Sequence, residues 1–108
     1  MIDFADITVL DGDTIVIAGE HIRILGMDAP ETFHARCDDE LEFGDRATIH
    51  LMDILGRGPV ELARRSGKDK YGRTLARVTV DGRDVATIMI RDGMAVPYNG
   101  KGRRKQWC

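Results

Sequence analysis

The sequence predicts a single α+β domain in which five strands curl into a barrel, with one helix between the third and fourth strands and a second helix after the fifth. Three observations predict it. The first 26 residues alternate apolar and polar side chains at the period of a strand, a stripe at helical spacing follows, and two more strand-like runs precede a capped helix. The length of 108 residues suits one domain, expected to span residues 1–108.

Three short strands are expected in the first 26 residues. Apolar residues recur there at period two: Ile7 and Val9, Ile15 and Ile17, Ile22 and Ile24. Asp11-Gly12 interrupts the first two runs and predicts a tight turn or a bulge. Gly19-Glu20 separates the next two and suits a two-residue hairpin turn with glycine first. Residues 27–36 are expected to form a loop, because Pro30 cannot occupy a central strand.

A helix is expected from about Asp39 or Gly44 to Leu55. Its apolar stripe at helical spacing comprises Phe43, Ala47, Leu51, Ile54 and Leu55. Gly56 suits the position that follows a helix C-terminus, and Pro59 prevents continuation of the helix.

The second half of the chain predicts two strands and a helix. The strands are expected at residues 60–64 and 74–80, separated by a polar loop at 65–72. Asp84 is expected to cap a helix that ends at Gly93, with Val85, Ile88 and Met89 facing inward. A short strand could follow at 94–96, with irregular chain from Pro97. This order of elements is the layout of an OB-type barrel, a fold that often binds oligonucleotides but does not by itself define a function.

The composition is that of an ordinary globular domain, with 43% hydrophobic and 31% charged residues. The net charge of −2 does not suit a protein that holds nucleic acid by its overall charge, so phosphate binding would need a local cluster. The dense basic run at 101–105 could be such a contact or a solvated tail.

No apolar run could span a bilayer, and no signal peptide opens the chain, so we expect no membrane partner. The chain would be cytoplasmic, or secreted or periplasmic after removal of a signal, and we expect a monomer.

The two cysteines, Cys37 and Cys108, are not spaced as metal ligands. They could be free thiols or one disulfide between the last residue and the loop before the first helix, and both readings stay open. In the chain-entropy model such a cross-link contributes on the order of 4 kcal/mol of stability.

The carboxylates of Asp13 and Asp28 are candidate ligands for a divalent cation. Both lie beside turns at strand ends, where side chains of different strands converge, and with the carbonyl of Ala29 they form an oxygen donor set suited to Ca²⁺ or Mg²⁺. Glu31 could orient or deprotonate a water molecule near such an ion. The alternatives are a plain Asp-Gly turn and a solvated loop acid. Asp11 is interpreted as a turn residue that could also support the metal ligands from behind.

The guanidinium groups of Arg23 and Arg73 are candidate phosphate ligands. Arginine binds phosphate oxygens in a bidentate fork and stabilises the extra charge of a phosphoryl transition state. Lys70, Tyr71 and Tyr98 are candidates for holding nucleic acid, because tyrosine rings can stack on bases. Ordinary packing at strand ends and on the surface is the alternative for these three residues.

Four segments, in this order and spacing, resemble the staphylococcal nuclease (thermonuclease) family from about Thr8 to Tyr98. They are Asp11-Gly12-Asp13-Thr14, Arg23-Ile24-Leu25, Asp28-Ala29-Pro30-Glu31-Thr32 and Asp69-Lys70-Tyr71-Gly72-Arg73-Thr74-Leu75-Ala76. The resemblance implies an OB-fold nuclease that uses one Ca²⁺ ion to hydrolyse DNA and RNA and leaves 3′-phosphate ends.

The resemblance also implies residue roles. Asp13 and Asp28 would bind calcium with their carboxylates and Ala29 with its carbonyl, while Glu31 would act on the attacking water. The phosphate would be clamped by Arg23 and Arg73, and the nucleotide pocket lined by Lys70, Tyr71 and Tyr98.

The chain departs from the family pattern in three places. The best-known member has threonine at the position of Ala29, and the segment before Tyr98 is one residue shorter here. The chain stops near Cys108, before the usual third C-terminal helix, and Trp107 and Cys108 could instead close the barrel by packing and by a bridge to Cys37.

A different class of function is a non-catalytic OB module that binds single-stranded nucleic acid or a protein partner. Degenerate domains of this kind typically lose members of the acid and arginine set. All five members are present here, namely Asp13, Arg23, Asp28, Glu31 and Arg73, which favours the enzyme.

Overall fold

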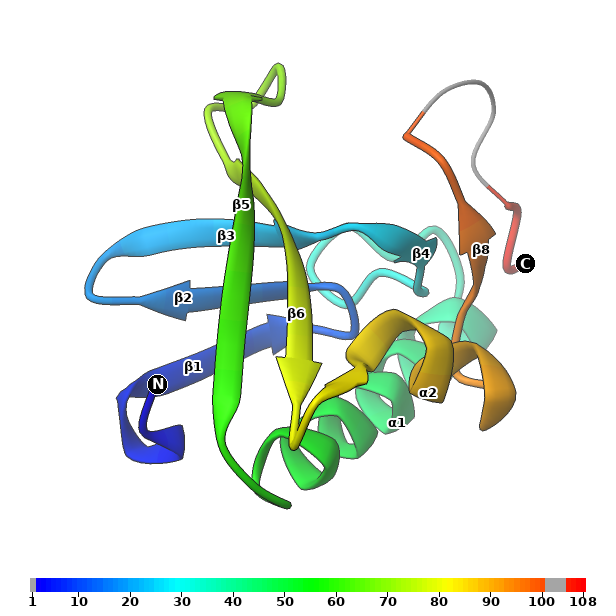
Figure 1. Ribbon diagram of the computed structural model, residues 1–108. Helices are drawn as coiled ribbons and strands as arrows, with labels where there is room; N and C mark the ends of the chain where they lie inside the picture. Colours follow the sequence, from blue (N-terminus) through cyan, green and yellow to red (C-terminus); the bar gives the residue numbers. More distant parts are fainter. Residues whose placement is uncertain (1, 101–104) are drawn as a thin grey trace.

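The computed structural model describes residues 2–100 and 105–108 and shows a strongly bent sheet with two helices packed beside it (Figure 1). The elements are η1 (Phe4–Asp6), β1 (Ile7–Asp11), β2 (Thr14–Ile17), β3 (Glu20–Ile24), β4 (Gly26–Asp28), α1 (Asp38–Leu55), β5 (Val60–Lys68), β6 (Thr74–Val80), β7 (Arg83–Asp84), α2 (Val85–Arg91) and β8 (Val96–Tyr98). Within the described residues, no helix combines the length and the apolarity that crossing a membrane requires.

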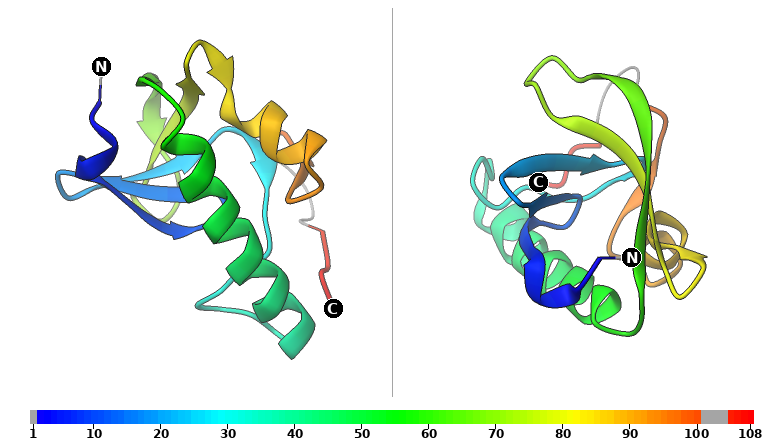
Figure 2. Two further views of the ribbon diagram at one scale, coloured as in Figure 1. Left: turned by 90° about the horizontal axis from the view of Figure 1, so that it is seen from below. Right: turned by 60° about the vertical axis from the view of Figure 1, so that its left-hand side comes forward.

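The main sheet has the strand order β1-β2-β3-β6-β5, with β7 paired to β6. The first three strands form an antiparallel meander, β5 and β6 form an antiparallel hairpin, and β3 and β6 join the two halves in parallel. The chain just before β1 returns to the start of β5 through a bridge between Ile2 and Val60. The two edges of the sheet therefore approach each other, and the fold is the predicted α+β, OB-type arrangement (Figure 2).

The core lies between the inner face of the sheet and the two helices. Helix α1 packs on β1 and α2, and α2 packs on β4 and β6. The predicted stripe of α1 is buried at Ala47, Leu51, Ile54 and Leu55. In α2 the predicted inward residues are also buried: Val85, Ile88 and Met89. Burial of each large apolar side chain stabilises the fold by about 1.5–3 kcal/mol.

The ends of the helices differ in detail from the prediction. Helix α1 begins at Asp38, earlier than expected, because the Sγ atom of Cys37 accepts the N–H of Glu40 and three acids occupy the first turn, where the helix dipole favours them. Gly56 caps α1 with a right-handed backbone, so no left-handed glycine is needed there. Asp84 caps α2 as predicted, and its side chain accepts the N–H of Thr87 at 3.1 Å.

Three local predictions were wrong. The β2–β3 turn uses Ala18 and Gly19, both with positive φ, so glycine is its second residue and not its first. Strand β5 runs to Lys68, with a bulge after Arg64, where a polar loop was expected from Arg65. Strand β4 forms where a loop was expected from Met27, and it pairs with β8, which lies at Val96–Tyr98 and not at the expected 94–96. Pro97 is tolerated there because β8 is an edge strand.

A disulfide joins Cys37 to Cys108, with a distance of 6.0 Å between the two Cα atoms. Beside it, the ring of Trp107 packs against Phe43 of α1, with centroids 5.2 Å apart. Residues 105–108 have no regular secondary structure. The end of the chain is therefore attached to the N-terminal half of α1 by one covalent and one aromatic contact.

Glu20 ties the β5–β6 hairpin to β3. Its carboxylate accepts hydrogen bonds from Nη2 and Nε of Arg64 at 2.7 and 3.0 Å and from Oγ1 of Thr74 at 2.7 Å. These bonds, from Arg64 first and then Thr74, lower the pKa of Glu20 from 4.5 to about 2.

Replacing Glu20 with glutamine is therefore expected to destabilise the protein in a pH-dependent way. A carboxyl group with a depressed pKa in the folded state contributes stability above pH 4.5, which is lost as the pH falls toward 2. Solvent screens this side chain, which is 31% exposed, so we expect an effect of about 1 kcal/mol at pH 7. Urea unfolding at pH 7, 4 and 3 measures it, with Glu61→Gln on β5 as the control. A difference from wild type that stays constant with pH would contradict this account.

Candidate metal and phosphate site

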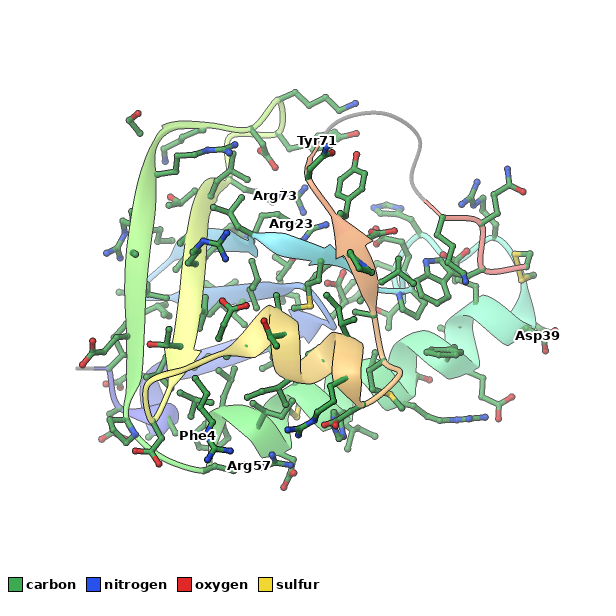
Figure 3. All side chains as sticks on the ribbon, turned by 45° about the vertical axis from the view of Figure 1, so that its right-hand side comes forward. Phe4, Arg23, Asp39, Arg57, Tyr71 and Arg73 are labelled. Atoms are coloured by element: carbon green, nitrogen blue, oxygen red, sulfur yellow. A yellow bond between two sulfur atoms is a disulfide. The ribbon has the colours of Figure 1, made fainter. Side chains whose placement is uncertain are left out.

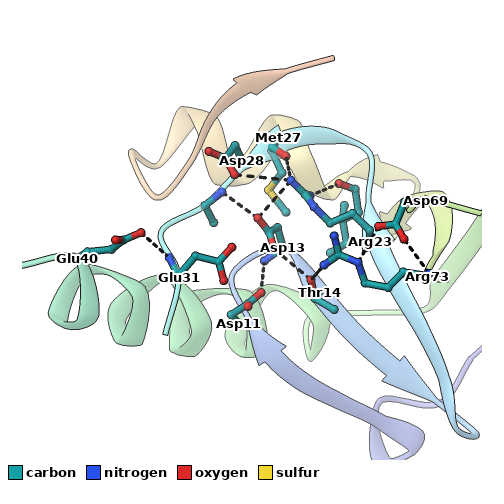
Figure 4. Close-up of polar contacts among 12 residues, drawn as sticks. Asp11, Asp13, Thr14, Arg23, Met27, Asp28, Glu31, Glu40, Asp69 and Arg73 are labelled. Carbon is teal, nitrogen blue, oxygen red and sulfur yellow. Dashed lines mark hydrogen bonds and ion pairs between the residues drawn. The ribbon is translucent and has the colours of Figure 1, made fainter. Parts of the chain in front are cut away.

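Four acidic residues meet where the β1–β2 turn lies against β4 and the loop after it (Figure 4). Asp11 ends β1, Asp13 lies in the turn, Asp28 ends β4 and Glu31 follows in the loop. Three of them are buried, with exposed fractions of 8% for Asp11, 3% for Asp13 and 0% for Asp28. The fold therefore brings together acids that lie on separate segments of the sequence.

Gly12 allows the turn to approach the loop closely. A Cβ atom at this position would lie 2.8 Å from the Cβ of Ala29 and 2.9 Å from that of Ala47 on α1, which is closer than side chains pack. With glycine there, the N–H of Ala29 reaches Oδ2 of Asp13 at 3.0 Å. The Asp-Gly turn is thus a packing contact with the loop as well as a change of chain direction.

Arg23 joins the two candidate metal ligands. Its Nη2 atom lies 3.3 Å from Oδ2 of Asp13 and 3.7 Å from Oδ1 of Asp28. The guanidinium also donates to the carbonyls of Ile24 at 2.8 Å and Met27 at 2.9 Å, and the residue is only 9% exposed. The group is therefore fixed by backbone acceptors, and both carboxylates converge on one of its nitrogen atoms.

Arg73 is held by residues that the predicted site did not include. Its Nε donates to Oδ2 of Asp69 at 2.7 Å and its Nη1 to Oγ1 of Thr14 at 3.4 Å. Thr14 in turn donates to Oδ1 of Asp13 at 3.1 Å, so the second arginine is linked to the acids through one hydroxyl. An acid four residues before an arginine, within a Gly-containing turn, is the sequence signal that could have identified Asp69.

Asp69 also organises the tight turn that precedes β6. Its Oδ1 accepts the N–H groups of Tyr71 and Arg73 at 3.0 and 2.8 Å. Burial raises the pKa of Asp69, but the hydrogen bonds from Arg73 and Tyr71 outweigh it and hold the pKa below its ordinary value. Asp69 is therefore an anionic anchor for the Arg73 side chain at neutral pH.

The electrostatic field among the acids is negative. Burial, followed by the nearby charge of Asp13, raises the pKa of Asp11 from 3.8 to about 8, and Glu31 adds to the effect. The part of this shift that comes from the neighbouring carboxylates, unlike the part that comes from burial, would also favour a bound cation. Asp11, interpreted from the sequence as a turn residue, is thus part of the same electrostatic cluster.

The donor set fits a hard divalent cation such as Ca²⁺. The carboxylates of Asp13 and Asp28 and the carbonyl of Ala29 are oxygen donors, which Ca²⁺ prefers and a thiophilic metal does not. Across residues 2–100 and 105–108, no three His, Cys, Asp or Glu side chains form a metal-binding group on their own. An ion at this place would therefore complete its coordination with water or with substrate oxygens.

Arg23 and Arg73 line a cleft of about 800 Å³, which lies on the side of these arginines away from the acids. Five predicted residues line it: Arg23, Lys70, Tyr71, Arg73 and Tyr98. Figure 3 shows Arg23, Arg73 and Tyr71 close together, at the opposite end of the molecule from Phe4 and Arg57. Asp13, Asp28 and Glu31 do not line this cleft. Arg23 contacts the two aspartates and also faces the cleft, so it connects the acids with the cleft.

Three further basic residues line the cleft, and none of them was predicted for the site. They are Arg65 and Lys68 of β5 and Arg77 of β6. Arg65 and Lys68 reach the cleft because β5 continues beyond Arg64. In the described part of the chain the cleft thus gathers six basic side chains and one acid, Asp69, despite a net charge of −2. Most of the predicted basic run at 101–105 lies outside the described residues.

Comparison with known proteins supports one family. The model of the family described as staphylococcal nuclease homologue matches residues 21–106. The chain is 35% identical over 102 residues to endonuclease YhcR of Bacillus subtilis (strain 168), covering 83% of this chain and 8% of that protein. It is 35% identical over 104 residues to the thermonuclease of Staphylococcus intermedius, covering 88% of this chain and 61% of that protein.

Another similar protein is not named as a nuclease. Succinoglycan biosynthesis protein ExoI of Rhizobium meliloti (strain 1021) is 33% identical over 93 residues, covering 82% of this chain and 49% of that protein. The chain therefore spans less than two thirds of the length of these relatives, and only 8% of the longest of the three.

Proposed function

This chain belongs to the staphylococcal nuclease family, and we propose that it is a Ca²⁺-dependent nuclease that hydrolyses phosphodiester bonds of DNA and RNA and leaves 3′-phosphate ends. One observation carries the proposal. A buried guanidinium, that of Arg23, contacts the carboxylates of Asp13 and Asp28 and also lines a cleft rich in basic side chains. One arginine thus connects the proposed metal ligands with the basic cleft.

Each part of the site has a distinct role in the proposed reaction. Asp13 and Asp28, with the carbonyl of Ala29, would hold the ion. When bound there, Ca²⁺ would act as a Lewis acid that offsets negative charge on the phosphodiester. Arg23 and Arg73 would hold non-bridging phosphate oxygens and stabilise the additional charge of the five-coordinate phosphorus. Thr14 and Asp69 would keep Arg73 in the orientation that this requires.

The chemical step is attack of water on phosphorus. Glu31 would orient the water and accept its proton as the new P–O bond forms. The bond from phosphorus to the 5′ oxygen breaks, and that oxygen takes up a proton to become a hydroxyl, which leaves the phosphate on the 3′ side. Lys70, Tyr71 and Tyr98 would hold the neighbouring nucleotides through charge and ring stacking.

Removal of calcium is expected to abolish cleavage. Purified protein would be incubated with heat-denatured DNA or with RNA, in Ca²⁺ or in excess calcium chelator, and the ends of the products analysed. We expect cleavage with Ca²⁺, a loss of at least about 100-fold without it, and full recovery when Ca²⁺ is restored. Without Ca²⁺, no dication would compensate the charges of the buried aspartates and of the phosphate.

The same experiment separates the enzyme from a binding module. A folded protein that binds a single-stranded oligonucleotide but does not cleave it with Ca²⁺, Mg²⁺ or Mn²⁺ would support the non-catalytic alternative. Cleavage with Mg²⁺ but not with Ca²⁺ would retain the nuclease and refute calcium as its metal.

A further inference from the structure

We propose that the N-terminal half of α1 fixes the main chain of Glu31, with Glu40 and Gly44 as positioning residues. The inference rests on the proposed role of Glu31 in the reaction. Glu31 lies in a segment, residues 29–37, that has no helix or strand of its own. Its placement therefore depends on contacts with neighbouring elements, and two such contacts come from α1.

The first contact is made by the carboxylate of Glu40. Oε2 accepts the N–H of Glu31 at 3.3 Å, and Oε1 accepts the N–H of Arg36 at 2.9 Å (Figure 4). Glu40 is only 1% exposed, although glutamate is rarely buried unless its charge is satisfied. The two oxygens thus hold both ends of the segment from Glu31 to Arg36.

The second contact is the close approach of Gly44. A Cβ atom at this position would lie 2.6 Å from the carbonyl oxygen of Glu31 and 3.0 Å from its carbonyl carbon. Both atoms belong to the backbone and cannot move away as a flexible side chain can. The helix thus binds the N–H of Glu31 through Glu40 and packs directly against its carbonyl at Gly44.

The placement of the Glu31 backbone is expected to affect the rate of the reaction. A displacement of about 1 Å in a reacting group can lower a rate by about 100-fold. Helix α1 is a suitable support, because its buried stripe is packed in the core and its first turn is tied by the Cys37–Cys108 disulfide. The position of the Glu31 main chain is therefore set partly by Glu40 and Gly44, which do not line the cleft.

The test of Gly44 compares this glycine, within α1, with Gly56, which caps the same helix. Gly44→Ala would add a methyl group against the Glu31 carbonyl, whereas Gly56→Ala would meet its nearest neighbour at 3.6 Å, an ordinary contact. We expect Gly44→Ala to lower kcat by about 10- to 100-fold with KM within about twofold. Gly56→Ala should leave both unchanged, and unfolding curves would confirm that both variants are folded.

The test of Glu40 uses amide exchange and needs neither metal nor substrate. Glu40→Gln keeps the size of the side chain but replaces one acceptor oxygen with a donor, so the N–H of Glu31 or of Arg36 loses its partner. We expect faster hydrogen exchange at Glu31 or Arg36, measured by NMR. The matched control, Glu42→Gln, alters an exposed glutamate of the same helix and should leave these amides unchanged.

A double-mutant cycle distinguishes positioning from general stability. Glu40→Gln should lower kcat about 10-fold or more in the wild-type protein but have little effect in a Glu31→Gln background. Equal effects in both backgrounds, or unchanged kcat in both Gly44→Ala and Glu40→Gln, would overturn the proposal. If the wild-type protein cleaves nothing, the proposed function fails, while the amide exchange still decides whether Glu40 holds Glu31.

Discussion

Replacement of Glu31 with glutamine is expected to lower kcat for nucleic acid cleavage by about 100- to 10,000-fold. Glutamine has the same shape and leaves the backbone N–H of residue 31 available to Glu40. What it removes is the negative charge and the ability to accept a proton from water. The variant therefore isolates the chemical role of the carboxylate from its place in the fold.

Initial rates with denatured DNA at saturating Ca²⁺ measure the effect. KM is expected to change little, because Arg23 and Arg73 belong to other parts of the chain and line the cleft. The exposed Glu42→Gln on α1 serves as the control for loss of one carboxylate. A Glu31→Gln enzyme with more than about a third of the wild-type kcat would exclude Glu31 from the proton transfer step.

Removal of the Cys37–Cys108 disulfide is expected to lower the free energy of unfolding by roughly 4 kcal/mol. The bridge joins residues 71 apart in sequence, and closure of so long a loop strongly restricts the unfolded chain. A domain of this size is typically stable by only about 5–15 kcal/mol, so this is a large fraction of its stability. The double variant Cys37→Ser/Cys108→Ser is the suitable test, because serine is also a good N-cap and preserves the start of α1.

Urea unfolding with and without dithiothreitol measures this contribution. We expect the reductant to shift the midpoint of the wild-type protein toward that of the double serine variant and to leave the variant itself unchanged. Identical midpoints for the wild-type protein with and without reductant, at full reduction confirmed by thiol titration, would refute a stabilising disulfide. Tm is expected to fall by on the order of 15 °C or more.

The features that could be predicted from the sequence are those specified by local periodicity and by short motifs. The stripe of α1 is confirmed because spacing along a helix determines which residues face the core. Asp84 is confirmed as a cap because capping depends on only three or four neighbouring residues. The motifs that contain Asp13, Arg23 and Asp28 indicated the residues that the fold brings into contact.

The features that could not be predicted depend on contacts between distant segments. The pairing of β4 with β8 joins segments about seventy residues apart, and its proline resembles an irregular chain. The continuation of β5 through polar residues is stabilised by its partner β6, not by apolar periodicity. Glu40 shows the same limit, because an acid in the first turn of a helix is common, and its contact with Glu31 exists only in the folded chain.

The parallel pairing of β3 with β6 has a consequence for folding kinetics. It joins Ile22 to Thr74, so a loop of roughly fifty residues must close when Arg23 and Arg73 come together. The turn that holds Asp13 belongs to a local meander, which closes only short loops. We therefore expect the Asp13 turn and Arg23 to be placed early, and Arg73 to join them late, as does Asp28 on β4, which pairs with the distant β8. On this view, cleavage competence appears only when the two halves of the sheet have combined, and partly folded chains would lack it.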